Sequence, residues 1–494
     1  MTIKGLTIEE RWVYFISAIF IILNALCITL EFYYFALIPL FLLIVILALF
    51  SIDKLVLILV FMTPFTIPLQ EISSNYDFDM ALPTEPILFG VMILFLLKLA
   101  VERKFDKRIA FHPVSIAIYI NLFWLFVTSI TSSMPLVSFK YLISRLWFVI
   151  AFYFIAVQLF KNYKNIKRYF WLYLIPLMGV IGYTLYRHFL HGFDQQSGNW
   201  VMTPFYKDHT SYGAILAMVI PVLIGLGTKS NYSKNFKILV WIVFPIIIVA
   251  TIFSYTRAAW FSLLGAFGVW IVLLLRIKFK VFLTITIVVV LILIRYQASL
   301  LMMMEKNKQD SSTNLSEHVK SMSNVATDAS NLERINRWKS ALRMYEKRPF
   351  FGWGPGTYMF QYAPFQISSE KTIISTNAGD RGNAHSEFLG PLAESGVFGT
   401  LTYLALVIAI IYTGIRAWQR SKDKDTRTMS LVFLLAMITY FLHGFLNNFL
   451  DTDKASVLFW GYAAMLVAMD IYHNNGQMIE NQSVQPTGAK TDAV

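Results

Sequence analysis

Three short segments in the second half of the chain hold residues that could do chemistry beside a membrane. The first is FSYTRAAW, in which Ser254 and Thr256 precede Arg257. A guanidinium presents a planar fork of donors that matches phosphate oxygens, and the two hydroxyls could add further donors. An arginine at the edge of an apolar hairpin can equally snorkel to lipid headgroups. These residues alone therefore leave an anion site and a lipid anchor as alternatives.

The second segment, NLERINRWKSALRMYEKRPFFGWGPG, carries two arginines on one helix face. Arg334 and Arg337 lie three positions apart, and Trp338 lies one turn after Arg334. The apolar spacing predicts a helix that starts near Ser330 or Asn331 and is closed by Pro349. A basic amphipathic surface helix is the alternative to an anion site. The GWGPG turn around Trp353 lacks the strand and helix that flank a nucleotide-binding loop.

The third segment, GNAHSEFLGPLAESGVFG, places a histidine just before an apolar run. A histidine is the natural general base near neutral pH, and His385 has Glu387 and Glu394 nearby in sequence. A structural histidine is the alternative reading. Other polar residues at the same membrane face are candidate cleft-lining residues or helix caps: Tyr206, Lys207, Asp208, His209, Asn447, Asn448 and Asp451.

Taken together, two arginines and one histidine fit a single chemistry. A lipid-linked pyrophosphate donor needs cationic stabilisation of its leaving group, and a hydroxyl acceptor needs a base. No Asp-x-Asp pair of the kind that binds a metal ion stands in these segments. We therefore expect arginine to stabilise the leaving-group charge, with no metal and no cofactor.

The elements that must position these residues are membrane helices. The chain of 494 residues is 57% hydrophobic and only 14% charged, whereas a soluble protein has about 25% charged residues. Fourteen apolar runs are long enough to be candidate spans, at 12–31, 33–51, 54–70, 84–101, 113–131, 141–160, 169–187, 210–228, 236–254, 258–275, 280–297, 394–415, 429–449 and 455–472. Because Cys27 is the single cysteine, we expect no disulfide and no thiolate metal site.

The basic residues predict the orientation. Alternate connections, the N-terminus and the tail hold a majority of the 42 Lys and Arg residues, which places them in the cytoplasm under the positive-inside rule. The net charge of +13 therefore reflects membrane orientation and does not indicate nucleic acid. Both termini are predicted to be cytoplasmic, and the candidate site lies on the opposite, external face of the membrane.

This pattern predicts an all-α polytopic membrane protein with about 12–14 transmembrane helices. One long, partly helical periplasmic loop precedes the last three spans. The expected parts are N-terminal helices over 1–209, central helices with the Arg257 hairpin over 210–297, a periplasmic loop subdomain over 298–393, C-terminal helices over 394–472, and a disordered cytoplasmic tail over 473–494.

In this order the three segments resemble the O-antigen ligase superfamily. That group comprises lipopolysaccharide O-antigen ligases, O-antigen polymerases and bacterial protein O-oligosaccharyltransferases. The motifs that carry the resemblance are SYTR at 254–257, RINRW at 334–338 with PFFGWGPG at 349–356, and AHSEFL at 384–389 with ESG at 394–396. The resemblance is dense from about residue 200 to 415 and covers only topology elsewhere.

The resemblance implies a GT-C-like fold and a role for each matched residue. His385 matches the histidine taken as the base that activates the acceptor hydroxyl. Arg257 and Arg334 match the arginines thought to hold undecaprenyl pyrophosphate, and Arg337 is a second candidate. The implied reaction is metal-independent and inverts the anomeric carbon. Ser386 departs from the Asn that often follows the histidine, and the family commonly has about twelve spans.

The sequence leaves the acceptor open. A ligase places the glycan on lipid A-core, a polymerase places it on another lipid-linked repeat, and an oligosaccharyltransferase places it on a protein hydroxyl. Of these we favour the ligase. A lipid-linked glycan flippase is the main alternative from another class, but such folds show two related halves with ionisable residues near mid-membrane. This chain instead gathers its distinctive residues at one face, which favours an enzyme over a flippase or a non-catalytic envelope scaffold.

Overall fold

A computed structural model describes residues 8–72, 80–228, 232–276, 329–372, 375 and 382–474. Most of this part of the chain is helical, and its strands β1 (Ile67–Pro68) and β2 (Ala81–Leu82) form one short antiparallel pair. Within these residues, twelve helical runs are long and apolar enough to cross a membrane. The predicted all-α polytopic membrane fold is therefore confirmed.

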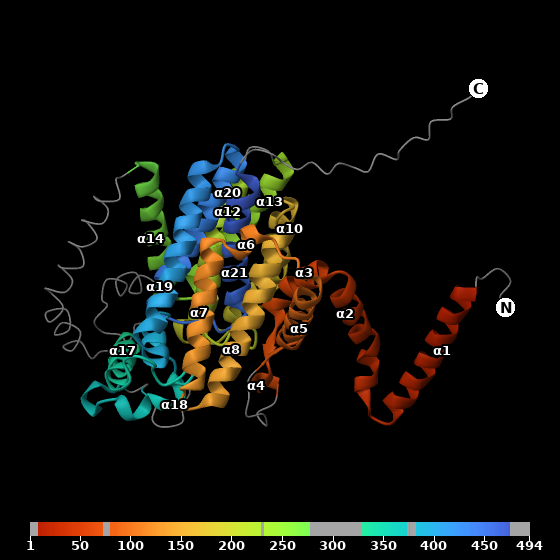
Figure 1. Cartoon of the computed structure of the whole chain (residues 1–494), viewed down its shortest axis with the longest axis horizontal. Coiled ribbons are helices and arrows are strands. Elements are labelled where there is room, and N and C mark those ends of the chain that lie inside the picture. The colour runs from red at the N-terminus through yellow and green to blue at the C-terminus, as the bar shows by residue number, and fades with distance from the viewer. Residues whose placement is uncertain are drawn as a thin grey trace. The chain divides into compact units, whose positions relative to one another are not determined.

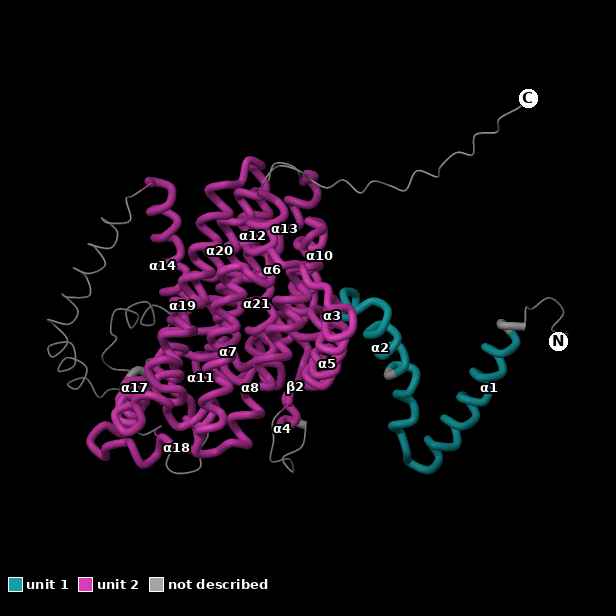
Figure 2. Tube along the Cα trace, in the orientation of Figure 1, with its two compact units in different colours: residues 1–55 teal, residues 56–494 magenta. Residues whose placement is uncertain are grey.

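The chain divides into two compact units, residues 1–55 and residues 56–494, which Figure 2 colours separately. In the first unit, the 3-10 helix η1 (Tyr33–Leu37) joins α1 (Ile8–Thr29) to α2 (Ile38–Phe50). No residue in the apolar windows of these two spans is buried within the chain. Such exposure suits helices whose surrounding solvent is hydrocarbon rather than water.

The remaining elements before the loop subdomain are α3 (Ile52–Met62), η2 (Thr63–Phe65), α4 (Leu69–Ile72), α5 (Thr84–Glu102), α6 (Lys107–Ala110), α7 (Pro113–Ile130), α8 (Pro135–Val149), η3 (Ile150–Ile155), α9 (Ala156–Leu159), α10 (Lys164–Leu190), α11 (Gln195–Gly198), α12 (His209–Thr228), α13 (Lys234–Phe253) and α14 (Arg257–Leu274). After it come α17 (Ala329–Lys347), α18 (Tyr358–Gln361), η4 (Ala363–Phe365), η5 (Ser368–Glu370), α19 (Leu389–Arg420), α20 (Lys424–His443), α21 (Asp453–Ala468) and η6 (Met469–His473).

Three helices form the centre of the second unit. Most residues of α12, α20 and α21 are buried, and α20 contacts α12, α14, α19 and α21. Around them, α19 packs against α7, and α13 packs against α12. At one end of this bundle lie α17 and α18, drawn in blue-green in Figure 1. That end positions the candidate site, because Arg257, Arg334 and His385 all belong to it.

The described helices agree with most of the predicted spans, and the helix predicted to end before Pro349 is observed as α17. The span predicted at 54–70 is wrong as a single helix, since α3 ends at Met62 and is followed by η2 and β1. Pro64 and Pro68 explain this, because proline lacks the N–H that continues a helix. The predicted span at 280–297 lies outside the described residues, as do the first part of the 298–393 loop and all but the start of the 473–494 tail.

The first turns of α19 are interrupted, and the interruption docks the loop subdomain. At Gly396 the backbone takes φ +68°, which breaks the helix. The carbonyl groups of Ala393 and Glu394 instead accept hydrogen bonds from the backbone N–H groups of Trp353 (3.1 Å) and Gly354 (2.7 Å). Val397 N–H donates to the Pro349 carbonyl at 2.9 Å. The glycine-rich turn is therefore a backbone clamp that replaces helical hydrogen bonds.

We expect Gly396→Ala to loosen this clamp. A Cβ at position 396 would overlap the carbonyl group of Phe350, and the left-handed backbone is itself unfavourable for alanine. The expected cost is about 2–4 kcal/mol in the free energy of unfolding, from strain and overpacking together. Thermal unfolding of the protein in detergent measures the change. Gly268→Ala in α14 is the matched control, because nothing lies within 4 Å of the added carbon, and equal melting of the two variants would contradict the clamp.

Candidate active site

Arg257 is held at the start of α14 by a tight turn from α13. Tyr255 adopts a left-handed backbone with φ +50°, which turns the chain between the two helices. The Ser254 hydroxyl donates to the Thr251 carbonyl at 2.8 Å, and the Thr256 hydroxyl donates to the His209 carbonyl at 2.7 Å. Both side chains are buried. Ser254 and Thr256 thus build the turn that presents Arg257, rather than offering their hydroxyl protons to a ligand.

The contact from Thr256 brings two helix N-termini together. The second belongs to α12, which starts at His209 and is capped by Asp208. The Asp208 carboxylate accepts from the Thr210 hydroxyl at 2.6 Å and from Ser211 N–H at 2.8 Å. Because N-terminal N–H groups carry partial positive charge, two adjacent helix starts favour an anion near Arg257.

Arg334 reaches the same cluster from α17. The pKa of Arg334 is lowered to about 10, mainly by burial and also by the positive charge of Arg257, with Asp208 opposing the shift. His209 also lies within electrostatic range of both arginines. At neutral pH the Arg334 guanidinium remains charged, so two cations from separate segments face one small region beside Asp208.

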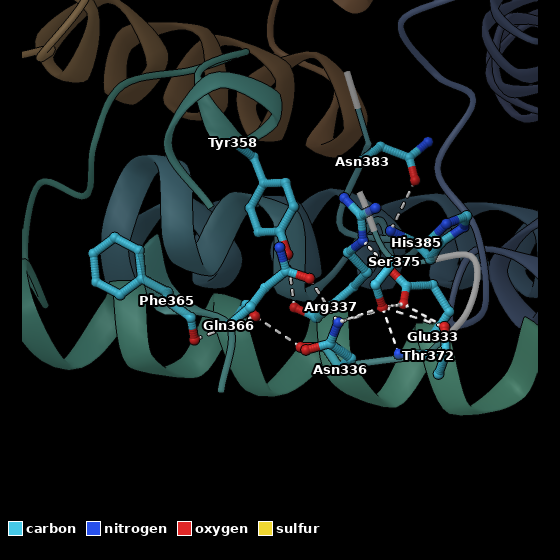
Figure 3. Close-up of polar contacts among 11 residues, drawn as sticks. Glu333, Asn336, Arg337, Tyr358, Phe365, Gln366, Thr372, Ser375, Asn383 and His385 are labelled. Atoms are coloured by element: carbon cyan, nitrogen blue, oxygen red, sulfur yellow. Dashed lines mark hydrogen bonds and ion pairs between the residues drawn. The ribbon is translucent and has the colours of Figure 1, made fainter. Parts of the chain in front are cut away.

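Arg337 lies one turn further along α17 but has a different environment. Its Nε donates to Glu333 Oε1 at 2.5 Å, and its guanidinium stacks on the Tyr362 ring at 4.0 Å. Glu333 also accepts from the hydroxyls of Thr372 and Ser375, as Figure 3 shows. The ion pair with Glu333 balances the charge of Arg337 within α17, and the hydrogen bonds from Thr372 and Ser375 to Glu333 connect α17 to the loop that leads to His385.

His385 has an unusual backbone that the loop subdomain holds in place. Its φ is +47°, a left-handed conformation that is uncommon for residues other than glycine. Its N–H donates to the Asn383 side chain at 3.1 Å, visible in Figure 3, and its carbonyl accepts from Trp338 Nε1 at 3.2 Å. Strain of this kind is often found at functional sites, where the surrounding structure enforces it.

The imidazole of His385 is kept neutral. Its pKa is lowered to about 4, mainly by burial and also by the charges of Arg334 and Arg337, while Asp208 and a hydrogen bond with Asn447 oppose the shift. The Asn447 Nδ2 atom lies 3.1 Å from Nε2 of His443, the last residue of α20. His443, which sequence reasoning missed, is buried and also within electrostatic range of Arg334 and Asp208. The sequence signal that could have found His443 is its spacing of four residues from Asn447, which in a helix places two side chains on one face.

One family model matches part of the chain. Residues 238–404 match the family model described as O-antigen ligase, and this range contains Arg257, Arg334 and His385. This part of the chain is similar to the O-antigen ligase family. The match supports the predicted O-antigen ligase superfamily and with it a ligase- or polymerase-type membrane enzyme. No curated protein matches the chain.

Two glutamates within the matched residues serve the scaffold in this structure. Glu387 accepts from the Tyr440 hydroxyl at 2.7 Å and from the backbone N–H groups of Phe449 (2.8 Å) and Leu450 (2.9 Å). Burial raises its pKa. Glu394 accepts from Tyr358 N–H at 3.0 Å. Both carboxylates therefore organise the chain around His385.

Two tryptophans and one lysine complete the predicted set. Trp338 positions His385, as described above, whereas Trp353 donates from Nε1 to the Met344 carbonyl at 3.0 Å and belongs to the clamp. Lys207 lies within electrostatic range of Asp451. Among the residues that the structure describes, no group of three His, Cys, Asp or Glu side chains is arranged to hold a metal ion.

We expect Glu387→Ala to destabilise the protein by about 2–4 kcal/mol, because it leaves several buried donors without an acceptor. Glu387→Gln keeps a carbonyl oxygen at the same place and should lose less than half as much. Chemical or thermal unfolding in detergent micelles measures both. If alanine and glutamine cost the same stability, the hydrogen bonds to residues 440–450 do not carry the effect.

Proposed function

We propose that the protein is a membrane glycosyltransferase that moves a glycan from undecaprenyl pyrophosphate to an acceptor hydroxyl. We take lipid A-core as the preferred acceptor, which makes the protein an O-antigen ligase. One observation carries the proposal above the others: Arg257, Arg334 and His385, from three separate segments, belong to one electrostatic cluster. The matching O-antigen ligase domain supports the same class of reaction.

The pyrophosphate is assigned to the two arginines. Guanidinium groups bind phosphate oxygens with paired hydrogen bonds, and the adjacent starts of α12 and α14 add positive potential. Binding an anion there relieves the repulsion between Arg257 and Arg334. Arg337 is a weaker candidate for this role, because its ion pair with Glu333 already balances its charge.

The reaction is a direct displacement. The acceptor oxygen forms a bond to the anomeric carbon, and the bond between that carbon and the pyrophosphate oxygen breaks. His385 takes the proton of the acceptor hydroxyl, and undecaprenyl pyrophosphate leaves with its charge stabilised by Arg257 and Arg334. Attack from the side opposite the leaving group inverts the anomeric configuration, with no step that requires a metal.

Donor binding also tunes the base. The charge of Arg334 contributes to the low pKa of His385. A bound pyrophosphate offsets that charge and raises the histidine pKa toward its usual value, which strengthens the base. His385 is thus a weak base until the donor binds. Before donor binding, its low pKa keeps the imidazole from taking up a proton from water.

The proposal places the reaction at the periplasmic face of a bacterial inner membrane, with both termini in the cytoplasm. Purified protein incubated with a lipid-linked donor and each acceptor in turn tests the function. Transfer to lipid A-core supports the ligase, whereas transfer only to a second lipid-linked repeat or to a protein hydroxyl indicates the polymerase or the oligosaccharyltransferase. Movement of the lipid-linked glycan across liposomes without transfer would contradict the enzyme.

We expect His385→Ala to lower the transfer rate by about 10²–10⁴-fold, the usual contribution of a general base. Arg257→Ala and Arg334→Ala should each cost about 10²–10³-fold through lost charge stabilisation. All three variants should insert into the membrane normally, and transfer is measured with purified protein.

The matched controls are Arg343→Ala and His191→Ala. Arg343 is on α17 with Arg334 but pairs with Glu370, and His191 is exposed. Both controls should keep most of the wild-type rate. Wild-type transfer by His385→Ala would refute its assignment as the base.

The pH dependence of transfer should differ between its two kinetic parameters. The free enzyme needs neutral His385, whose pKa is about 4, so kcat/KM for the donor should fall only as the pH drops toward 4. The donor-bound enzyme has a higher histidine pKa, so kcat should fall at a higher pH. Steady-state rates between pH 4 and 8 measure how each parameter falls with pH. If kcat and kcat/KM both fall with the same apparent pKa near 6.5, donor binding does not shift the pKa of His385.

A further inference from the structure

An open groove of about 340 Å³ lies between the first turns of α10 and α13 and has no role in the proposed reaction. It is lined by Lys164, Lys167, Arg168 and Trp171 from α10 and by Phe236 and Leu239 from α13, and the two helices contact each other. The 20 residues of α13 span about 30 Å and lead to the turn that presents Arg257. The groove therefore lies about one hydrocarbon thickness from the candidate active site, at the opposite boundary of the membrane.

The rim of the groove is cationic. Lys164, Lys167 and Arg168 share one face of α10, because positions three and four apart are neighbours on a helix. Lys164 and Arg168 are exposed, whereas Lys167 is half-buried with its Nζ 3.7 Å from the centre of the Phe236 ring. Among the residues that the structure describes, none of these three cations forms an ion pair with a carboxylate.

This cluster of like charges is unfavourable without an anion. The first turns of α10 and α13 contain no acidic residue that could offset it. By contrast, α20 starts at the same end of the bundle, because it ends beside the candidate site, and it has Asp423 as its N-cap and Asp425 in its first turn. Asp425 lies within electrostatic range of Tyr232, which precedes α13, but it is buried and does not line the groove. A bound anion would relieve the repulsion among the rim cations.

The floor of the groove is apolar and aromatic. The Trp171 and Phe236 rings meet edge-to-face with their centres 5.6 Å apart, and Leu239 is 47% exposed. Lys167 Nζ also lies 4.5 Å from the centre of the Tyr232 ring. Tryptophan and tyrosine are enriched where a membrane meets water, because each side chain combines an apolar body with a polar end. A cationic rim beside such a floor fits an amphiphile with an anionic head and an apolar tail.

We propose that this groove binds an anionic phospholipid, with its phosphate at the rim and the start of an acyl chain on Trp171 and Leu239. A lipid phosphodiester supplies negative charge at the membrane boundary, where Lys and Arg donate charge-assisted hydrogen bonds to its oxygens. A soluble phosphate ester shares the chemistry of the headgroup, so the experiment compares the two sources. The inference is independent of the proposed transfer reaction, because the groove shares no residue with the arginine cluster.

The test counts lipids bound to the purified full-length protein in detergent, by native mass spectrometry during a titration. Three probes are compared: phosphatidylglycerol, zwitterionic phosphatidylcholine with the same acyl chains, and glycerol phosphate without chains. The groove variant is K164Q/K167Q/R168Q, which removes the three rim cations together. Lys167→Gln and Lys167→Arg are measured as single changes.

The matched control is R103Q/K104Q/K107Q. It removes the same number of charges from exposed residues in the connection between α5 and α7. Lys161, just before α10, pairs with Asp106 of that connection at 3.6 Å. The control therefore changes the charge at the same end of the bundle but leaves the groove intact.

The wild type should bind one phosphatidylglycerol more tightly than phosphatidylcholine. The groove variant should weaken this binding at least about tenfold, since each cation near a lipid headgroup contributes about fivefold. Lys167→Gln alone should lose about fivefold, whereas Lys167→Arg and the control variant should bind as the wild type does. Retention by Lys167→Arg distinguishes a lost charge from a damaged fold.

Four results would each overturn the assignment. One is equal affinity of the wild type for phosphatidylglycerol and phosphatidylcholine. Another is an equal loss in the control variant, because basic residues that only orient the protein attract anionic lipid wherever they lie. A loss in Lys167→Arg as large as that in Lys167→Gln would show that charge at the rim does not bind the lipid. Glycerol phosphate bound as tightly as phosphatidylglycerol would assign the rim to a soluble anion. The proposed transfer reaction stands or falls separately from all four.

Discussion

The site depends on two guanidinium groups brought together where bulk water is limited. Arg257 opens a transmembrane helix, Arg334 belongs to the loop subdomain, and the charge of the first acts on the second. Repulsion between like charges increases as the surrounding dielectric falls. Asp208 offsets part of it, and a pyrophosphate has the charge and geometry to offset more. The same field keeps His385 neutral, so in the proposed mechanism anion binding and base strength are linked through one electrostatic balance.

The scaffold holds this balance mainly with backbone hydrogen bonds. The break in α19 at Gly396 leaves carbonyl groups that accept hydrogen bonds from the glycine-rich turn. These hydrogen bonds attach the loop subdomain to the first turns of α19. Glu387 fixes the segment after α20 from the other side. Trp338 and Asn383 then hold His385 in a left-handed conformation. Most of these contacts join segments that are distant in sequence, which suits a site assembled from three separate segments.

The apolar runs predicted most spans and helical spacing predicted α17, because both signals are local. The error at 54–70 arose because a run of apolar residues hides the effect of Pro64 and Pro68. Residue type and spacing singled out Arg257, Arg334 and His385, and the resemblance implied their roles, but their convergence depends on long-range packing. The scaffold contacts of Glu387 and the place of His443 beside the arginine cluster were not predictable for the same reason: their partners lie in other segments of the chain.

Binding of undecaprenyl pyrophosphate to the protein in nanodiscs tests the central claim most directly, since it isolates the arginine pair from the chemical step. The account predicts that Arg334→Gln weakens this binding at least about tenfold, as expected when a charged hydrogen-bond donor of about 1.5–3 kcal/mol is lost. Arg343→Gln, on the same helix, should bind as tightly as the wild type. Equal affinity of Arg334→Gln and the wild type would contradict the account.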